Sequence, residues 1–425
     1  MAEGGTAHVI GAGLAGLAAA VRLADSGRRV RLWEAAPQAG GRVRSFFDDR
    51  VGGVIDNGAH LVLAGNRDVR AYLDTIAATD RVRVADGAAF PFFDKETKAR
   101  WHVRFGRSRV PFWLLCPASR PPGAGAVSFM RDVWRLLRAS PSQTVTAVIP
   151  ATSPWMRPFW NPLSRAVLNA APEDGAACLL AAVLREAWIG GGAGLRPVLA
   201  KTSLDDAFIQ PALRFLEGKG ALVRFGCRLK VIEMAGGQAA RLVFTDETVS
   251  LGSGDAVVLA VPAYQATEMV DGLTMPEGTR AILNAHFHLD DGAADACPVA
   301  RGAFTGIVGG VAEWAFRRGR VLSVTVSAAD ALMDEDADQL AARLWADVAA
   351  LSGLAREPVP PHRVIKERRA TVAATPENET RRPGTKTRWP NLFLAGDGTK
   401  TGLPGTIEGA VRSGFRASDA VMAGL

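Results

Sequence analysis

Three glycines near the N-terminus have the spacing of a phosphate-binding turn. Gly11, Gly13 and Gly16 form the pattern Gly-x-Gly-x-x-Gly between a short apolar segment and an alanine-rich one. In such a turn the first glycine permits a tight bend, the second lets the backbone approach a pyrophosphate, and the third lets a helix lie close to the sheet. Leu14 and Ala15 fall at the start of that helix, where free N–H groups and the helix dipole favour anions. The pattern predicts a dinucleotide site; the alternative is a chance turn between strand and helix.

An acidic residue follows the next predicted strand, residues 29–33, at the position of a ribose contact. Glu34 comes directly after this strand. A carboxylate about 20 residues beyond the glycine turn accepts hydrogen bonds from an adenosine ribose. The glycine pattern with Glu34 still does not separate FAD from NAD.

Later segments favour FAD. Gly40, Gly41 and Arg42 combine flexible backbone with a guanidinium group, which suits a phosphate or the electron-rich edge of a flavin. Near the C-terminus, Gly396 and Asp397 end an apolar segment, and this carboxylate suits the ribityl hydroxyls.

Two more segments complete the predicted cofactor site. Residues 56–60 form a turn after a short predicted strand and are expected to reach the cofactor. A last helix is expected to begin near Thr406, where the positive end of its dipole would lie under the flavin pyrimidine and stabilise negative charge on the reduced ring. The predicted cofactor contacts in these segments are Asn57, Gly58, Pro404, Thr406 and Ile407.

Taken in order, these motifs resemble the superfamily of flavin amine oxidases and carotenoid desaturases. The segments that carry the resemblance are the first glycine motif with Glu34 and residues 40–42, 56–58, 259–262 and 395–397. Within the superfamily, residues 56–60, 309–314, 322–330 and 401–414 are similar to the hydroxysqualene dehydroxylases, a group first described as squalene-associated FAD-dependent desaturases. Ala59, Gly398 and Gly405 depart from the usual pattern, which affects details of the flavin pocket but not the fold.

The resemblance implies an α/β fold in which a Rossmann-like FAD-binding domain is interleaved with an α+β substrate domain. Residues 7–65, 201–262 and 386–425 are expected to form the FAD-binding domain. Residues 66–200 and 263–385 are expected to form the substrate domain, helical first and strand-rich second. The resemblance also implies a backbone contact of Leu229 with the adenine.

The reaction implied by the resemblance is reductive dehydroxylation of hydroxysqualene to squalene, with hydride passing from N5 of reduced FAD to an allylic carbon. His60 is the first candidate to protonate or hydrogen-bond the leaving hydroxyl, with Asp56 as its orienting partner. The alternative is a structural histidine bonded to backbone near the flavin. Asn284, His286 and His288 share one face of a predicted strand, and packing against the other domain is favoured over catalysis.

Three other functions share this fold. A carotenoid-type desaturase removes hydride instead of adding it, and the sequence does not set the direction. An amine oxidase would bring tyrosines to an aromatic cage, whereas Tyr72 and Tyr264 are the only tyrosines and neither is expected near the C-terminal flavin motif. A non-enzymatic prenyl-lipid carrier would be expected to have lost the phosphate motif, which is complete here.

Composition agrees with a large enzyme. The 425 residues, 48% of them hydrophobic, are enough for two or three domains with their own cores. The four cysteines are far apart and the six histidines lack metal-ligand spacing, so reduced packing cysteines and no metal are expected. The N-terminus has no secretory pattern and no segment is long and apolar enough to span a bilayer, so a cytoplasmic location is predicted.

The net charge of +7 indicates that the protein binds an anionic partner. The spread of basic residues along the chain argues against nucleic acid as this partner. An anionic membrane surface at the inner face of the membrane is the more economical interpretation, with contact through residues 101–160. The alternative is that the aromatic side chains of this region pack inward. The resemblance implies an apolar isoprenoid substrate, with hand-over from an upstream hydroxysqualene-forming enzyme. The members of the expected contact are Trp101, Arg104, Arg107, Arg109, Phe112, Trp113, Leu114, Leu115, Phe129, Met130, Arg131, Trp134, Arg135, Arg138, Trp155, Met156, Arg157, Phe159 and Trp160.

Overall fold

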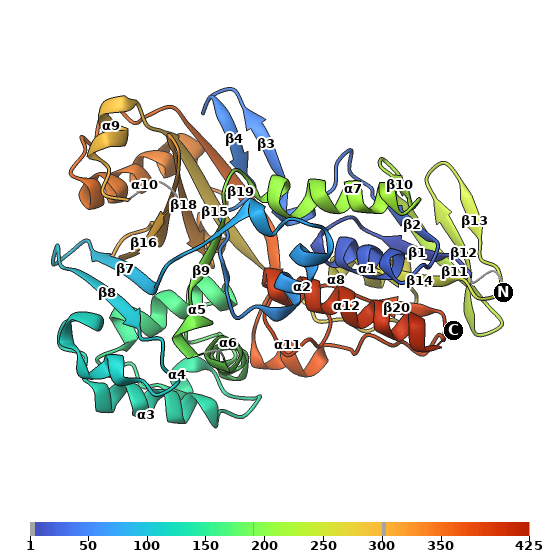
Figure 1. Cartoon of the computed structure of the whole chain (residues 1–425), viewed down its shortest axis with the longest axis horizontal. Coiled ribbons are helices and arrows are strands. Elements are labelled where there is room, and N and C mark those ends of the chain that lie inside the picture. The colour runs from blue at the N-terminus through green and yellow to red at the C-terminus, as the bar shows by residue number, and fades with distance from the viewer. Residues whose placement is uncertain (1–4, 190, 300–302, 425) are drawn as a thin grey trace.

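A parallel sheet carries the N-terminal glycine motif (Figure 1). The computed structural model describes residues 5–189, 191–299 and 303–424. The sheet has the order β10-β2-β1-β14-β20, and every strand pair in it is parallel. Its strands are β1 (Ala7–Ile10), β2 (Val30–Trp33), β10 (Leu222–Arg224), β14 (Ala256–Leu259) and β20 (Leu392–Leu394). Because parallel strands end at one edge, this order brings the segments after β1, β2, β14 and β20 together, as the predicted Rossmann-like fold requires.

Small residues let helices lie close to this sheet and to each other. The helices on one face are α1 (Leu14–Asp25), α2 (Arg67–Thr75), α7 (Gln210–Gly218, preceded by a π-helical turn, Asp205–Ile209) and α12 (Ile407–Gly424). A Cβ at Gly414 of α12 would lie 2.3 Å from the Ala15 carbonyl oxygen, so a glycine is needed where α12 crosses α1. Val69 and Tyr72 of α2 belong to the same core as α1, so this core extends beyond the boundary predicted at residue 65.

The opposite face of the parallel sheet is covered by a small antiparallel sheet and a short helix. The antiparallel sheet consists of β11 (Leu229–Ala235), β12 (Gln238–Phe244) and β13 (Thr248–Ser250), and the helix is α8 (Ala263–Met269). Trp33 of β2 packs on Phe244 with ring centroids 4.5 Å apart. The central strands β1 and β14 and the neighbouring β20 are therefore buried along their whole length, whereas β2 and β10, at the other side of the sheet, keep exposed residues.

A seven-stranded sheet forms the centre of the second part of the molecule, to the left in Figure 1. Its order is β19-β15-β18-β17-β16-β7-β8, and only the β16–β7 pair is parallel. The strands are β7 (Ala88–Asp94), β8 (Arg100–Phe105), β15 (Thr279–His288), β16 (Ala303–Val308), β17 (Trp314–Arg318), β18 (Val321–Ser327) and β19 (His362–Val372). Helix α10 (Ala337–Ser352) covers one face, where Trp345 meets Phe287 of β15. Two short helices lie in the connections of this sheet: α9 (Asp291–Ala296) is between β15 and β16, and α11 (Pro376–Arg381) follows β19.

A helical layer packs against the β7–β8 end of that sheet. It contains α3 (Ala126–Leu137), α4 (Val145–Val148), α5 (Asn161–Leu168), α6 (Ala177–Ile189) and a π-helical turn (Met156–Trp160). Its interior is an aromatic cluster, and the aromatic residues of the predicted membrane contact divide accordingly. The buried members of the predicted contact, for which the membrane prediction is wrong, are Trp101, Trp113, Leu114, Phe129, Trp155, Met156, Phe159 and Trp160. Phe112, Leu115, Met130 and Trp134 are exposed.

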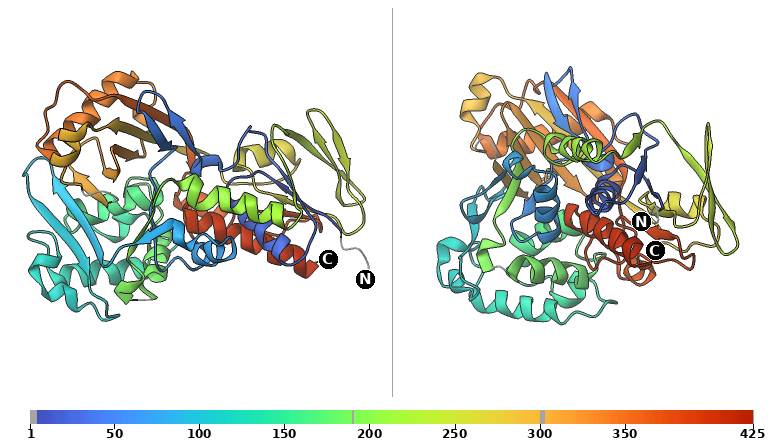
Figure 2. Two further views of the ribbon diagram at one scale, coloured as in Figure 1. Left: turned by 45° about the horizontal axis from the view of Figure 1, so that its top comes forward. Right: turned by 45° about the vertical axis from the view of Figure 1, so that its right-hand side comes forward.

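Two small sheets join the part of the molecule around the parallel sheet to the part around the seven-stranded sheet. The chain also passes between these two parts several times (Figure 2). The hairpin of β3 (Ser45–Asp48) and β4 (Gly53–Asp56) extends from the side of the parallel sheet toward β15. The other joining sheet is β5 (Val62–Leu63), β9 (Pro197–Ala200) and β6 (Val82–Val84). The predicted interleaving of the two parts is thus visible in the chain path.

Candidate functional site

The glycine turn between β1 and α1 leaves open space at its second glycine. Gly11 has a φ of +100°, and a Cβ there would lie 2.6 Å from the Ala260 carbonyl oxygen. A Cβ at Gly16 would lie 1.8 Å from the Gly11 carbonyl oxygen, so this glycine is needed for packing. A Cβ at Gly13 would meet nothing within 4 Å. Gly13, Leu14 and Ala15 therefore border a cradle at the positive end of α1, the place for a diphosphate.

Glu34 lies directly beside this cradle. Its carboxylate accepts hydrogen bonds from the backbone N–H groups of Ala12 at 2.7 Å and Ala36 at 2.8 Å. Each carboxylate oxygen keeps a further lone pair, which suits a ribose hydroxyl. The Cys227 N–H donates to the Glu34 carbonyl at 2.8 Å, which brings the start of β11 and Leu229 alongside.

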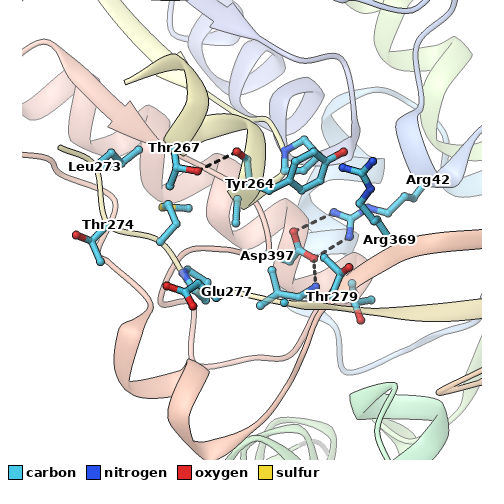
Figure 3. A pocket seen from close by; sticks show the side chains of 16 residues that line it. Arg42, Tyr264, Thr267, Leu273, Thr274, Glu277, Thr279, Arg369 and Asp397 are labelled. Carbon is cyan, nitrogen blue, oxygen red and sulfur yellow. Dashed lines mark hydrogen bonds and ion pairs between the residues drawn. The ribbon is translucent and has the colours of Figure 1, made fainter. Parts of the chain in front are cut away.

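Arg42 and Asp397 are brought together from opposite ends of the chain. The Arg42 guanidinium donates to both carboxylate oxygens of Asp397, at 2.7 and 3.0 Å (Figure 3). Burial alone would raise the pKa of Asp397, but the charge and hydrogen bonds of Arg42 lower this pKa to about 2. The two predicted cofactor contacts therefore partner each other, and Asp397 stays ionised.

The C-terminal segments converge on the same place. Gly396 has a φ of +111°, and its N–H donates to the Ser413 hydroxyl of α12 at 2.8 Å. Helix α12 begins at Ile407, and the Thr406 hydroxyl accepts from the Gly409 N–H at 3.2 Å. The predicted helix start near Thr406 is confirmed. A Cβ at Gly405, the position that departs from the family pattern, would lie 3.2 Å from Asp397 Oδ2.

The turn after β4 places amides and an imidazole around Gly58. Asn284 Nδ2 donates to the Asn57 carbonyl at 3.2 Å, and the Thr325 hydroxyl donates to Asn284 Oδ1 at 2.8 Å. A Cβ at Gly58 would lie 3.2 Å from Asn284 Nδ2 and 3.4 Å from His60 Nε2. Asn284 and His60 thus face the same space beside Gly58, and a side chain at position 58 would press against both.

His60 is held as a neutral imidazole. Burial lowers its pKa; the charge of Asp56 opposes this effect and the charge of Arg42 adds to it. A neutral imidazole donates through one ring nitrogen but is not a protonated acid. Of the two roles predicted for His60, hydrogen bonding of a leaving hydroxyl agrees better with the lowered pKa than full proton donation does.

Asp56 has a structural role instead of the predicted orienting role. Its carboxylate accepts hydrogen bonds from the Ser45 hydroxyl at 2.6 Å, the Leu204 N–H at 3.0 Å and Arg318 at 2.7 Å. Among the described residues, none of the hydrogen bonds of this carboxylate goes to His60. Asp56 therefore ties the β3–β4 hairpin to the segment before α7 and to β17, and the prediction that it orients His60 is wrong.

The polar row on β15 packs against the β3–β4 region, the interpretation favoured from the sequence. His286 Nδ1 lies 2.8 Å from the Ser323 hydroxyl, and His288 Nδ1 lies 2.8 Å from the Val51 carbonyl oxygen. Burial lowers the pKa of His286 to about 4. Asn284, at the end of this row, is the member that reaches the space beside Gly58.

A cavity of about 450 Å³ opens next to Arg42 and Asp397 (Figure 3), a volume in the range of ligand sites. Tyr264 and Arg369 line it, with the Arg369 guanidinium 4.4 Å from the centre of the Tyr264 ring. Tyr264 thus lies beside the C-terminal flavin motif, contrary to the sequence-based expectation. Its position two residues after Leu259–Pro262, one of the family motifs, was the signal that could have placed it there.

The sequence pattern of the family described as flavin containing amine oxidoreductase matches residues 14–422. The chain belongs to this family. It is 43% identical to the hydroxysqualene dehydroxylase of Rhodopseudomonas palustris, covering 98% of both chains. It is 41% identical to the enzyme of that name from Sinorhizobium fredii, covering 97% of both chains. It is 39% identical to that from Zymomonas mobilis, covering 97% of this chain and 98% of the relative.

Solved structures agree on the fold. A double mutant of putrescine oxidase with redesigned cofactor binding matches with a TM-score of 0.72 at 14% identity, covering 99% of both chains. A putative protoporphyrinogen oxidase from Exiguobacterium matches with a TM-score of 0.69 at 15% identity, also covering 99% of both chains. These structures show the flavin amine oxidase-like fold, and the family match with the relatives above shows that the chain is an FAD-dependent oxidoreductase.

The residues present fit FAD. The space at Gly13 accepts a diphosphate, and Glu34 offers free lone pairs beside it. Asn57 Oδ1 is buried and accepts no hydrogen bond from any residue that the structure describes, as expected of an atom that faces a bound ligand. The remaining predicted contacts, Gly41, Gly396, Pro404, Thr406 and Ile407, come from the segments that meet around Arg42 and Asp397.

Proposed function

We propose that the chain catalyses the FAD-dependent reductive dehydroxylation of hydroxysqualene to squalene, a step of isoprenoid and hopanoid biosynthesis. The observation that carries the proposal is 39–43% identity, over nearly the whole chain, to three proteins named hydroxysqualene dehydroxylase. The rival desaturase function has weaker support, because the phytoene desaturase of Solanum lycopersicum is 21% identical. L-amino-acid oxidases such as that of Bungarus fasciatus match only 24% of this chain.

The chemistry divides between cofactor and protein. Bound reduced FAD supplies a hydride to carbon. The substrate loses its allylic hydroxyl, which takes one proton and departs as water, so that one C–O bond breaks and one C–H bond forms. The protein must therefore hold the allylic carbon, assist departure of the hydroxyl and exclude bulk water.

His60 and Asn284 are the groups of this chain suited to the leaving hydroxyl. Both face the space beside Gly58, and each offers an N–H donor there. Asn284 is fixed in orientation by Thr325 and by the Asn57 carbonyl, so its second N–H is directed without further ordering. Hydrogen bonds from these donors stabilise the charge that develops on oxygen as the C–O bond lengthens.

Two charged features complete the site. The N-terminus of α12, at Thr406 and Ile407, directs the positive end of its dipole toward the place where the segments meet and stabilises negative charge there. The Arg42–Asp397 ion pair links the segment of residues 40–42 to the C-terminal cofactor segment.

The proposal includes peripheral binding at the inner face of the membrane. No helix among the described residues is both long and apolar enough to cross a bilayer. A substrate as apolar as hydroxysqualene resides in the membrane, and direct hand-over from the enzyme that forms it would avoid transfer through water. Entry of the substrate from the membrane surface is therefore consistent both with the lack of a membrane-spanning helix among the described residues and with a substrate that resides in the membrane.

Anaerobic single turnover tests the proposal. Protein reduced chemically and mixed with hydroxysqualene should form squalene while its flavin absorbance returns. Oxidised protein should not dehydrogenate squalene or phytoene at a comparable rate. Product formation from the oxidised flavin alone would assign the chain to the desaturases.

A further inference from the structure

One end of the molecule carries a row of apolar side chains that point away from the core. Helix α3 forms the lower edge in Figures 1 and 2, next to the 3-10 turn η3 (Phe112–Leu115). Val127 and Trp134 of α3 are 82% and 55% exposed, and Phe112 and Leu115 of η3 are 65% and 75% exposed. Together with Met130, these residues are called the apolar face below. An exposed cluster of this kind marks a site of interaction.

The apolar face is fixed from behind. Phe129, on the inner side of α3, stacks on Trp160 at 5.4 Å and lies 5.3 Å from the ring of Trp113 of η3. Asp132 is fully buried and accepts hydrogen bonds from the Ser153 hydroxyl and from Trp160 Nε1. These contacts hold α3 and η3 against one aromatic cluster, so their outward side chains cannot turn into the core.

The charged residues around the apolar face are almost all basic. Residues 97–172 contain eleven basic residues and one acidic residue, Asp132, which is buried. The chain as a whole has a net charge of +7, so the rest of it is net acidic. Arg107 and Arg109 precede Phe112, Arg131 lies on α3 and Arg138 caps its C-terminus; all four are exposed. Among the described residues, no carboxylate forms an ion pair with any of these four.

We propose that the apolar face and its arginines dock on the surface of an anionic lipid bilayer. The proposal deepens the proposed function, whose substrate is a membrane lipid, by naming the residues that contact the membrane. Aromatic and aliphatic side chains flanked by arginines match the boundary between acyl chains and negative headgroups. A second copy of this chain is a poor occupant, because a symmetric dimer through this face would bring like charges together.

Vesicle co-sedimentation with matched variants tests the proposal. Holoprotein is mixed with vesicles of phosphatidylcholine, with or without phosphatidylglycerol. Each cation near an anionic surface contributes about 1 kcal/mol, or about fivefold in affinity, so removing two should weaken binding about 25-fold. Arg131→Glu with Arg138→Glu should lose at least that much, whereas the control Arg70→Glu with Arg214→Glu, exposed residues on α2 and α7, should lose far less.

A second pair of variants tests the apolar side chains. Phe112→Ser with Leu115→Ser should reduce the binding that persists at high salt. Phe47→Ser with Met422→Ser, also exposed apolar residues but on β3 and α12, should not. A polarity-sensitive fluorophore on the exposed Cys116, next to Leu115, should shift to the blue only with anionic vesicles. Flavin content and melting temperature verify that each variant is folded.

Several results would overturn the proposal. Equal binding to neutral and anionic vesicles would remove the role of the arginines. Equal losses in the face variants and their controls would show a response to net charge alone. Concentration-dependent dimerisation abolished by Phe112→Ser with Leu115→Ser, without vesicle binding, would assign the face to a second copy. These measurements need no substrate, so their failure is distinct from failure of the dehydroxylation proposal.

Discussion

Replacing Gly13 by alanine separates cofactor binding from folding. Gly13 has φ of −69° and ψ of 173°, a conformation open to alanine, and a Cβ there would touch no protein atom within 4 Å. The substitution reduces the conformational freedom of the unfolded chain, so the apoprotein should gain about 0.4–1 kcal/mol of unfolding free energy. The fold is thus expected to tolerate Gly13→Ala fully.

FAD binding should respond in the opposite direction. The new methyl group would occupy the space at the N-terminus of α1 and displace the diphosphate from a backbone N–H. A hydrogen bond to a charged group is worth about 1.5–3 kcal/mol, so FAD affinity should fall about 10- to 150-fold. At FAD equal to 100 times the wild-type Kd, ligand stabilisation should drop from about 2.7 kcal/mol to about 0.9 kcal/mol for a 30-fold loss.

Fluorescence titration with FAD and denaturant unfolding with and without FAD measure both effects. Gly16→Ala is the matched control, because its Cβ would lie 1.8 Å from the Gly11 carbonyl oxygen. It should destabilise the apoprotein by about 1–3 kcal/mol through overpacking. The reasoning would be refuted if Gly13→Ala bound FAD like the wild type, or if it destabilised the apoprotein as Gly16→Ala does.

Three further predictions follow from the site. Glu34→Gln should weaken FAD binding about tenfold in the same titration, because an amide oxygen is a weaker acceptor than a carboxylate; an unchanged Kd would exclude the ribose contact. His60→Leu should slow single-turnover squalene formation about 100-fold while His60→Gln, which keeps an N–H donor, should slow it less; equal rates in both variants would remove the hydrogen-bonding role. The buried His286 has a pKa of about 4 against an ordinary 6.5, so the unfolded chain takes up its proton first as pH falls. Its contribution to the unfolding free energy should be complete above pH 6.5 and decrease by about 3 kcal/mol as pH falls to 4, a decrease that urea unfolding should not detect in His286→Gln.

The sequence predicted the parts of the site that depend on local backbone. Gly11, Gly13 and Gly16 lie in one turn, and Glu34 ends the neighbouring strand, so spacing alone places them together. The start of α12 near Thr406 was predictable for the same reason. The family resemblance placed the C-terminal motif at the same site, where Gly396 and Asp397 meet Arg42.

Side-chain partners distant in sequence were not predictable. Asp56 is four residues from His60, yet its carboxylate bonds to Leu204 and Arg318, which only the tertiary fold brings near. Likewise, the list of aromatic residues over 101–160 could not show which side chains point inward. On α3 the difference follows the helical period, since Phe129 and Asp132 are buried whereas Met130 and Trp134 are exposed.

The most direct test of the central claim is the origin of the hydrogen that replaces the hydroxyl. Protein should be reduced with dithionite in D2O without oxygen and mixed with hydroxysqualene for one turnover. Hydrogen on the reduced flavin nitrogen exchanges with solvent, so hydride transfer predicts squalene with one deuterium at the former carbinol carbon, in an amount equal to the flavin reoxidised. Squalene without deuterium, or no squalene while the flavin stays reduced, would contradict the account.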